Sequence, residues 1–251
     1  KSKTIVEIAL DPFLLNHLGS PVVKNGPFKG MEYPSFQSVG STIFPKIIGC
    51  YEAELHSIID DLVEERFEYI YDIGCAEGYY AIGFALQNPS AKVFAYDILE
   101  TARELCRKMS LLNNTQERVI IEAAFSQTSF QQIPQDKKTL IICDCEGYEM
   151  ELFNEAALPF LKNTTLLIET HDFLNPEISI HLQNLLNDTH QIKWIQSVDD
   201  ILKAKYYSFK ELNGLTITQR KELVKEVRPA IMEWILAEPN DSKQLQQNKF
   251  I

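Results

Sequence analysis

From residue 69 onward, short apolar runs alternate with longer amphipathic stretches, and this alternation restricts the fold more than any other feature of the sequence. Strands that alternate with helices along a chain form a parallel sheet with helices on both faces. The last two predicted strands have no regular crossover helix between them, which indicates a reversed final strand. We therefore predict an α/β, doubly wound, mostly parallel seven-stranded sheet with an antiparallel last strand. The predicted strands are 69–73, 92–97, 118–122, 138–144, 164–169, 191–196 and 231–237, and the predicted helices are 51–66, 79–88, 101–113, 149–161, 177–186 and 218–227.

Two segments depart from the alternation. Residues 1–50 are rich in glycine and proline between positions 21 and 45, which indicates turns and short extended pieces. We predict that they form an N-terminal cap on the substrate side of a main domain, residues 51–251, or else an extra structural layer over the sheet. Residues 197–230 are predicted to be an insert that forms another wall of the site or the interface of a homodimer. The polar contacts expected from the cap are Ser41, Thr42 and Lys46.

The charge of the chain argues against two classes of partner. Lys plus Arg is 24 and Asp plus Glu is 35, so the net charge is −11, whereas nucleic acid and anionic membranes need a basic surface. The nearest basic cluster, from Arg220 to Arg228, alternates with Glu222 and Glu226 and is interpreted as a solvated helix face. No apolar run approaches the ~18–20 residues that cross a bilayer. We therefore expect neither nucleic acid nor a membrane as a partner.

The cysteines and the first residues bear on the location of the protein. Five cysteines, an odd number without a metal-type pair of C-x-x-C units, indicate reduced thiols. Glu7 and Asp11 interrupt the short apolar stretch at the start of the sequence, which does not resemble a signal peptide. We therefore expect a cytoplasmic protein.

The most informative segment lies where the first predicted strand passes into a helix, and it reads Asp72-Ile73-Gly74-Cys75-Ala76-Glu77-Gly78. An open α/β sheet binds nucleotide-like ligands at this place. Gly74 permits a tight turn, and Gly78 allows a ligand or the following helix to approach the backbone. Ala76 stands where the dinucleotide fingerprint has its middle glycine, which disfavours a pyrophosphate site. Asp72 is an acceptor suited to an ammonium group or a fixed water.

The second predicted strand ends in an acid, Asp97, which lies 19 residues after Gly78. A carboxylate at this position accepts hydrogen bonds from both ribose hydroxyls of an adenosine and disfavours a 2′-phosphate. A ligand with a positive charge, a ribose and no phosphate fits this pattern better than a dinucleotide does.

Together these two segments resemble the first motif and the ribose-binding acid of class I S-adenosylmethionine-dependent methyltransferases. Within that superfamily, Asp144-Cys145-Glu146-Gly147-Tyr148-Glu149 is similar to the D-x-E-G-x-E signature of FkbM-type methyltransferases. The run Glu169-Thr170-His171 resembles the acid-x-histidine ending of that group's next strand, and Tyr51-Glu52 resembles the segment that leads into its core. The likeness covers about residues 50–172.

The resemblance implies a Rossmann-like fold, S-adenosyl-L-methionine as the cofactor, and O-methylation in natural-product or polysaccharide pathways. It also implies a set of cofactor-binding residues, which are Glu52, Asp72, Gly74, Cys75, Ala76, Gly78, Tyr79, Asp97 and Ala124.

Acidic and histidine side chains follow the fourth and fifth predicted strands. Asp144 ends one strand and Glu169 ends the other, with His171 close behind it, so adjacent strands bring these groups to one rim. In one interpretation the three side chains bind a divalent cation, Mg²⁺ or Mn²⁺, that polarises an acceptor hydroxyl, and catechol-type methyltransferases place acids at similar positions. In the other there is no metal, and Asp144 or His171 is the general base. Glu146 and Glu149 are interpreted as charges that favour the N-terminus of the next helix.

The leading hypothesis is therefore O-methylation of a hydroxyl on a small-molecule, sugar or natural-product acceptor. One alternative is N-methylation of an amine, which needs no metal. Another is a binding module that keeps the cofactor fold without catalysis. Binding of S-adenosylhomocysteine and sensitivity of turnover to a chelator separate these possibilities.

Overall fold

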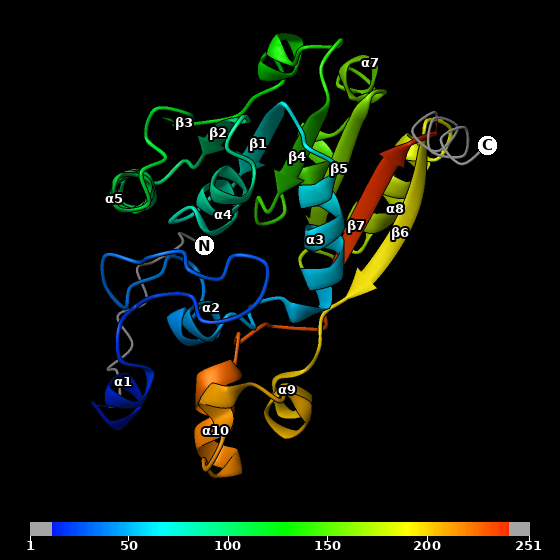
Figure 1. The fold of residues 1–251 in the computed structure, drawn as a ribbon. Helices are drawn as coiled ribbons and strands as arrows, with labels where there is room; N and C mark the ends of the chain where they lie inside the picture. Colours follow the sequence, from blue (N-terminus) through cyan, green and yellow to red (C-terminus); the bar gives the residue numbers. More distant parts are fainter. Residues whose placement is uncertain (1–11, 241–251) are drawn as a thin grey trace, which may run out of the picture.

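The computed structural model describes residues 12–240, which build a seven-stranded sheet in the order β3-β2-β1-β4-β5-β7-β6 (Figure 1). β1 pairs in parallel with β2 and β4, whereas β7 lies antiparallel between β5 and β6. The predicted doubly wound sheet with a reversed last strand is therefore confirmed. Residues 1–11 of the predicted cap and 241–251 of the predicted main domain lie outside the described residues. The strands are β1 (Tyr69–Ile73), β2 (Lys92–Tyr96), β3 (Val119–Glu122), β4 (Thr139–Cys143), β5 (Thr164–Thr170), β6 (His190–Gln196) and β7 (Glu233–Pro239).

The sheet separates two hydrophobic cores, because successive residues of a strand point to opposite faces. In β4, Leu140 and Ile142 belong to one core, whereas Ile141 and Cys143 belong to the other. Helices α3, α4 and α5 and the N-terminal segment cover the first face, and α6, α7 and α8 cover the second. The helices are α1 (Pro12–Leu18), α2 (Ile43–Ile48), α3 (His56–Glu64), α4 (Tyr79–Gln87), α5 (Glu100–Leu112), α6 (Glu149–Leu152), α7 (Leu158–Leu161), α8 (Glu177–Leu186), α9 (Asp200–Tyr206) and α10 (Ile217–Val224), with short 3-10 helices η1 (Ala53–Leu55), η2 (Ser129–Gln132) and η3 (Lys210–Leu212).

The single helix predicted over residues 149–161 is wrong, because the chain breaks it into α6 and α7. Phe153 takes an extended conformation at the end of α6. The Asn154 side chain then donates to the carbonyl of Glu151 at 2.9 Å and accepts from the N–H of Ala156 at 2.9 Å. An asparagine that bonds its neighbouring backbone in this way competes with helical hydrogen bonds.

The insert at residues 197–230 contains a helix that the sequence did not predict, α9. Its N-cap is Asp199, whose side chain accepts from the N–H of Ile201 at 2.8 Å. Together with α10 and α2 it lies beyond the carboxyl ends of the parallel strands (Figure 1). The predicted helix 51–66 also differs, since it begins as η1 before α3 follows. Within the described part of the chain, every helix is too short or too polar to span a bilayer.

Candidate functional site

Two cavities open at the carboxyl ends of the parallel strands. The polar cavity has a volume of about 180 Å³ and is lined by the turn after β1, the ends of β4 and β5, part of the N-terminal segment and residues 226–229. The apolar cavity has a volume of about 540 Å³ and lies beside the end of β2. Gly74, Asp144 and Glu146 line both. The two cavities therefore meet at these three residues.

The glycines of the turn after β1 have separate reasons to lack a side chain. Gly74 has φ +84°, and a Cβ there would lie 1.8 Å from the backbone oxygen of Asp144. Gly78 has φ +94°, and a Cβ there would lie 2.7 Å from Sγ of Cys106 on α5. Both adopt the left-handed conformation that favours glycine. Ala76 also has a positive φ, +50°, at the position of the missing middle glycine.

The two predicted acids of the cofactor site hold the backbone of the turn and of the helix after it. Asp72 is buried, and its Oδ2 accepts from the N–H of Ala81 on α4 at 2.9 Å. Asp97 accepts from the N–H groups of Ala76 at 3.0 Å and Leu99 at 2.8 Å. Asp72 lines the polar cavity and Asp97 lines the apolar cavity. Each acid therefore accepts hydrogen bonds from the backbone and also lines a cavity.

The other predicted cofactor residues divide between the cavities. Cys75 and Tyr79 line the polar cavity, and Ala124 lines the apolar cavity. A hydrogen bond with Cys106 and burial raise the pKa of Cys75 well above its ordinary value, which agrees with an inert thiol. Glu52 does not line either cavity, although it was predicted to bind the cofactor, because its carboxylate is buried and accepts from the hydroxyl of Tyr80.

The structure brings the predicted metal or base residues together. One ligand atom each from Asp144, Glu169 and His171 lies within 4.8 Å of the others. Nε2 of His171 is 3.5 Å from Oδ1 of Asp144 and 3.8 Å from Oε2 of Glu169. Two carboxylates and an imidazole are a donor set that divalent cations such as Mn²⁺ accept. Among the described residues this is the one group with such an arrangement.

Glu149 has a role that the sequence did not reveal. It is fully buried, and Nδ1 of His171 donates to its Oε1 at 2.7 Å. Burial opposes protonation of His171, but the bond with Glu149 and the charge of Asp144 outweigh it and raise the pKa of the imidazole to about 9. The hydrogen bond directs Nε2 toward Asp144 and Glu169, as carboxylates commonly do for metal-binding histidines.

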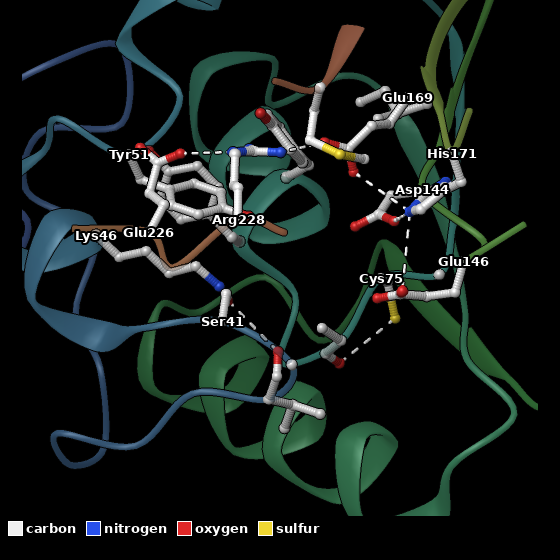
Figure 2. A pocket seen from close by; sticks show the side chains of 18 of the residues that line it. Ser41, Lys46, Tyr51, Cys75, Asp144, Glu146, Glu169, His171, Glu226 and Arg228 are labelled. Carbon is white, nitrogen blue, oxygen red and sulfur yellow. Dashed lines mark hydrogen bonds and ion pairs between the residues drawn. The ribbon is translucent and has the colours of Figure 1, made fainter. Parts of the chain in front are cut away.

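Arg228 is a second residue of the site that the sequence missed. Its Nε lies 2.9 Å from Glu226, its Nη2 lies 2.5 Å from Glu52, and its Nη1 contacts Glu169. Figure 2 shows the guanidinium between Glu226 and Glu169. The prediction of a solvated helix face is wrong for this residue, because α10 ends at Val224 and the chain then turns into the polar cavity.

The N-terminal segment reaches the same cavity through α2 and the residues before it. Lys46 is buried and forms an ion pair with Glu77 of the turn after β1. Ser41 lines the polar cavity as well. Thr42 does not, although it was predicted as a polar contact, because its hydroxyl donates to the backbone carbonyl of Lys225 at 2.5 Å.

Comparison with known proteins identifies the family. A family model described as a methyltransferase domain matches residues 68–223. A protein from Klebsiella pneumoniae that is provisionally named an O-methyltransferase superposes with a TM-score of 0.51 at 13% identity, over 93% of this chain and 92% of that one. An O-methyltransferase from Bacillus cereus, solved in complex with SAH, superposes with a TM-score of 0.50 at 14% identity, over 76% of this chain and 82% of that one. Among proteins with curated functions, none matches the sequence.

Likeness at such low identity shows the fold, whereas the family model carries the assignment. It spans more than half of the sequence and includes the turn after β1, the strand-end acids and the cluster of Asp144, Glu169 and His171. The chain therefore belongs to the family of S-adenosylmethionine-dependent methyltransferase domains.

Proposed function

We propose that this chain is an FkbM-type O-methyltransferase that acts on a hydroxyl of a small-molecule, sugar or natural-product acceptor, with a divalent cation held by Asp144, Glu169 and His171. The observation that carries the proposal is the position of this cluster. Asp144 lines both cavities, and the other two residues line the polar cavity beside it. The cluster therefore lies where a ligand that spans both cavities would pass.

The cofactor would lie with its adenosine in the apolar cavity and its methionine end in the polar cavity. Asp97 keeps lone pairs for ribose hydroxyls beyond its two backbone bonds, and apolar residues around it, among them Leu99 and Phe125, suit an adenine. The methionine end would then follow Gly74 and Cys75 into the polar cavity. When bound, the cofactor supplies a methyl group on a sulfonium, which would lie near the junction of the cavities.

The cluster also fits a cation. The ligand atoms come from two adjacent strand ends and from an imidazole already oriented by Glu149. When bound, a divalent cation lowers the pKa of an acceptor hydroxyl. Asp144, Glu169 and His171 would hold it at the rim, while Tyr51 and Phe173 in the cavity wall would limit access of water. Placing the hydroxyl in line with the methyl group and the sulfonium would contribute much of the rate enhancement.

The acceptor would enter from the side of residues 226–229 and Phe173, since this wall belongs to the polar cavity alone. A small acceptor suits a cavity of about 180 Å³ that also receives part of the cofactor. We further propose a cytoplasmic enzyme, in keeping with its five free cysteines.

The test combines binding with turnover. Wild-type protein should bind S-adenosylhomocysteine in calorimetry, and it should transfer a labelled methyl group to members of a panel of hydroxylated acceptors. Dialysis against EDTA should remove this activity, and Mn²⁺ should restore it. The variants Asp144→Asn and His171→Ala should each lose turnover and keep S-adenosylhomocysteine binding, with effects far from additive.

Glu155→Gln is the matched control, because Glu155 is an exposed acid on the connection between α6 and α7. It should behave as wild type. Full activity after EDTA dialysis, with no metal in elemental analysis, would favour His171 or Asp144 as a general base. Methylation of amines alone would favour the N-methyltransferase, and cofactor binding without any transfer would favour the binding module.

A further inference from the structure

The methionine part of the proposed cofactor carries a carboxylate, which needs a cationic or hydrogen-bonding partner. A lysine and an arginine line the polar cavity, Lys46 of α2 and Arg228. They lie in different surroundings, and this difference indicates which of them is available to a carboxylate.

Arg228 is already occupied by carboxylates. Each of its three nitrogens contacts a different acid, with Nε on Glu226, Nη1 on Glu169 and Nη2 on Glu52. A fourth carboxylate would meet the negative charge of these three acids at close range. Like charges that are buried together repel strongly, so Arg228 is an unfavourable partner for the cofactor.

Lys46 has a different arrangement. Its ammonium contacts the carboxylate of Glu77 and donates to Oγ of Ser38 at 3.1 Å. An ammonium has three hydrogens. Glu77 and Ser38 accept two of these hydrogens and do not line the polar cavity, whereas Lys46 does, which leaves one hydrogen for an acceptor in the cavity. The ring of Tyr51 lies beneath the ammonium, 4.7 Å from Nζ to the ring centroid.

Lys46 lies beside the turn after β1. Its partner Glu77 follows Cys75 and Ala76, which line the same cavity. The hydroxyl-bearing Ser41, from the same N-terminal segment, lines it too. Figure 2 shows Lys46 and Ser41 on one side of the pocket and Asp144, His171 and Glu169 on the other.

We propose that Lys46, assisted by Ser41, binds the carboxylate of the cofactor's methionine part. This inference rests on the proposed use of S-adenosylmethionine in the two cavities. It makes the N-terminal segment a part of the cofactor site, and it leaves the acceptor side to residues 226–229 and Phe173.

Two ligands separate this role from a structural one. S-adenosylhomocysteine contains the carboxylate, whereas 5′-methylthioadenosine contains the nucleoside and sulfur without the amino-acid group. In calorimetry, Lys46→Met should bind S-adenosylhomocysteine roughly 10- to 100-fold more weakly, the effect of a lost charge-assisted hydrogen bond. Its affinity for 5′-methylthioadenosine should stay at the wild-type value. Lys46→Arg should recover most of the loss.

Lys46→Met leaves the buried carboxylate of Glu77 without its cation, so the double variant Lys46→Met/Glu77→Gln is measured as well. Removing both charges avoids an unpaired buried charge, and the same difference between the two ligands is expected. Thr42→Val is the matched control, since it removes a hydrogen bond of the same segment outside the cavity. It should leave the ratio of the two affinities unchanged.

Equal weakening of both ligands would show that Lys46 only supports the turn, and unchanged affinities would show that the carboxylate binds elsewhere. Either result overturns the inference and leaves the proposed function standing. A wild-type protein that binds neither ligand would overturn the proposed cofactor site and the inference together.

Discussion

Gly74 shows at the scale of one residue how the turn after β1 depends on its neighbours. The residue has a positive φ, and the backbone of Asp144 occupies the space of a Cβ. Gly19 has a similar φ, +71°, but nothing lies within 4 Å of the position of a Cβ there. A comparison of substitutions at the two glycines therefore separates the energetic cost of the backbone conformation from that of the steric clash with Asp144.

Gly74→Ala should lower the free energy of unfolding by at least about 3 kcal/mol, since conformational strain and a clash with backbone act together. Gly19→Ala should lower it by only about 1–2 kcal/mol, because only the conformation is unfavourable. Urea denaturation followed by circular dichroism measures both values. Equal losses would mean that Asp144 moves aside at little cost.

Asp97 permits a second test at the same scale. Asp97→Ala should weaken binding of S-adenosylhomocysteine by about 2–3 kcal/mol, through lost hydrogen bonds to a carboxylate. The melting temperature should fall too, because Asp97 holds the N–H of Ala76. Calorimetry measures the affinity, with the exposed acid Glu104 on α5 changed to Gln as the control. A lower melting temperature with unchanged affinity would contradict the ribose assignment.

At the scale of elements, the connection between α10 and β7 is held in place by side chains of other segments. Asp200 accepts from the N–H groups of Glu226 at 2.9 Å and Val227 at 3.1 Å. Val227 has φ +59°, an unfavourable conformation for a β-branched residue. Lys203 of α9 forms a buried ion pair with Glu226. This connection therefore keeps a strained shape because several buried charges determine it.

Arg228→Met should lower the free energy of unfolding by about 3–5 kcal/mol, the usual cost when a buried ion pair loses one partner. The reason is that Glu52, Glu169 and Glu226 would lose their common cation. Denaturant titration measures the loss. Arg220→Met is the control, since Arg220 donates to the backbone carbonyl of Tyr207 in the same insert and forms no ion pair within residues 12–240. A loss no larger than that of the control would mean that water replaces the guanidinium.

At the scale of the whole molecule, buried carboxylates affect stability in opposite directions as the pH changes. Burial opposes ionisation of Glu77 and Glu226, but Lys46 and Lys203 respectively outweigh it and hold each pKa below its ordinary value. Their contribution is present above the ordinary pKa and is lost as the pH falls through the lower folded value. Burial and the charge of Glu226 raise the pKa of Glu54 to about 7. Between its ordinary 4.5 and this value, stability therefore decreases as the pH rises.

Stability should consequently be highest at mildly acidic pH. Glu54→Gln should raise the free energy of unfolding by about 1–3 kcal/mol at pH 8, because no charge then needs to be buried. Near pH 4.5 it should differ little from wild type, which provides an internal control. Chemical denaturation at a series of pH values measures this, and parallel curves for the two proteins would contradict the raised pKa.

The sequence alone determined the sheet, the turn after β1 and the identity of the strand-end residues, because these features depend on local patterns. Apolar runs of strand length, glycines at a sharp turn and acids at strand ends are visible within a few neighbouring residues. The prediction of one helix over 149–161 failed where a single asparagine side chain competed with the helix. The hydrophobic periodicity of this segment gives no sign that the asparagine side chain bonds to the backbone in place of a helical hydrogen bond.

The tertiary structure decided which side chains meet. Arg228 lies 176 residues from Glu52 and 59 from Glu169, and Lys46 lies 31 from Glu77. A charged residue in a polar stretch looks solvated in sequence, since nothing near it shows the partners that bury it. Whether its charge is exposed or paired depends on chain segments that only folding brings together, and the desolvation of the pair then makes the contact energetically important.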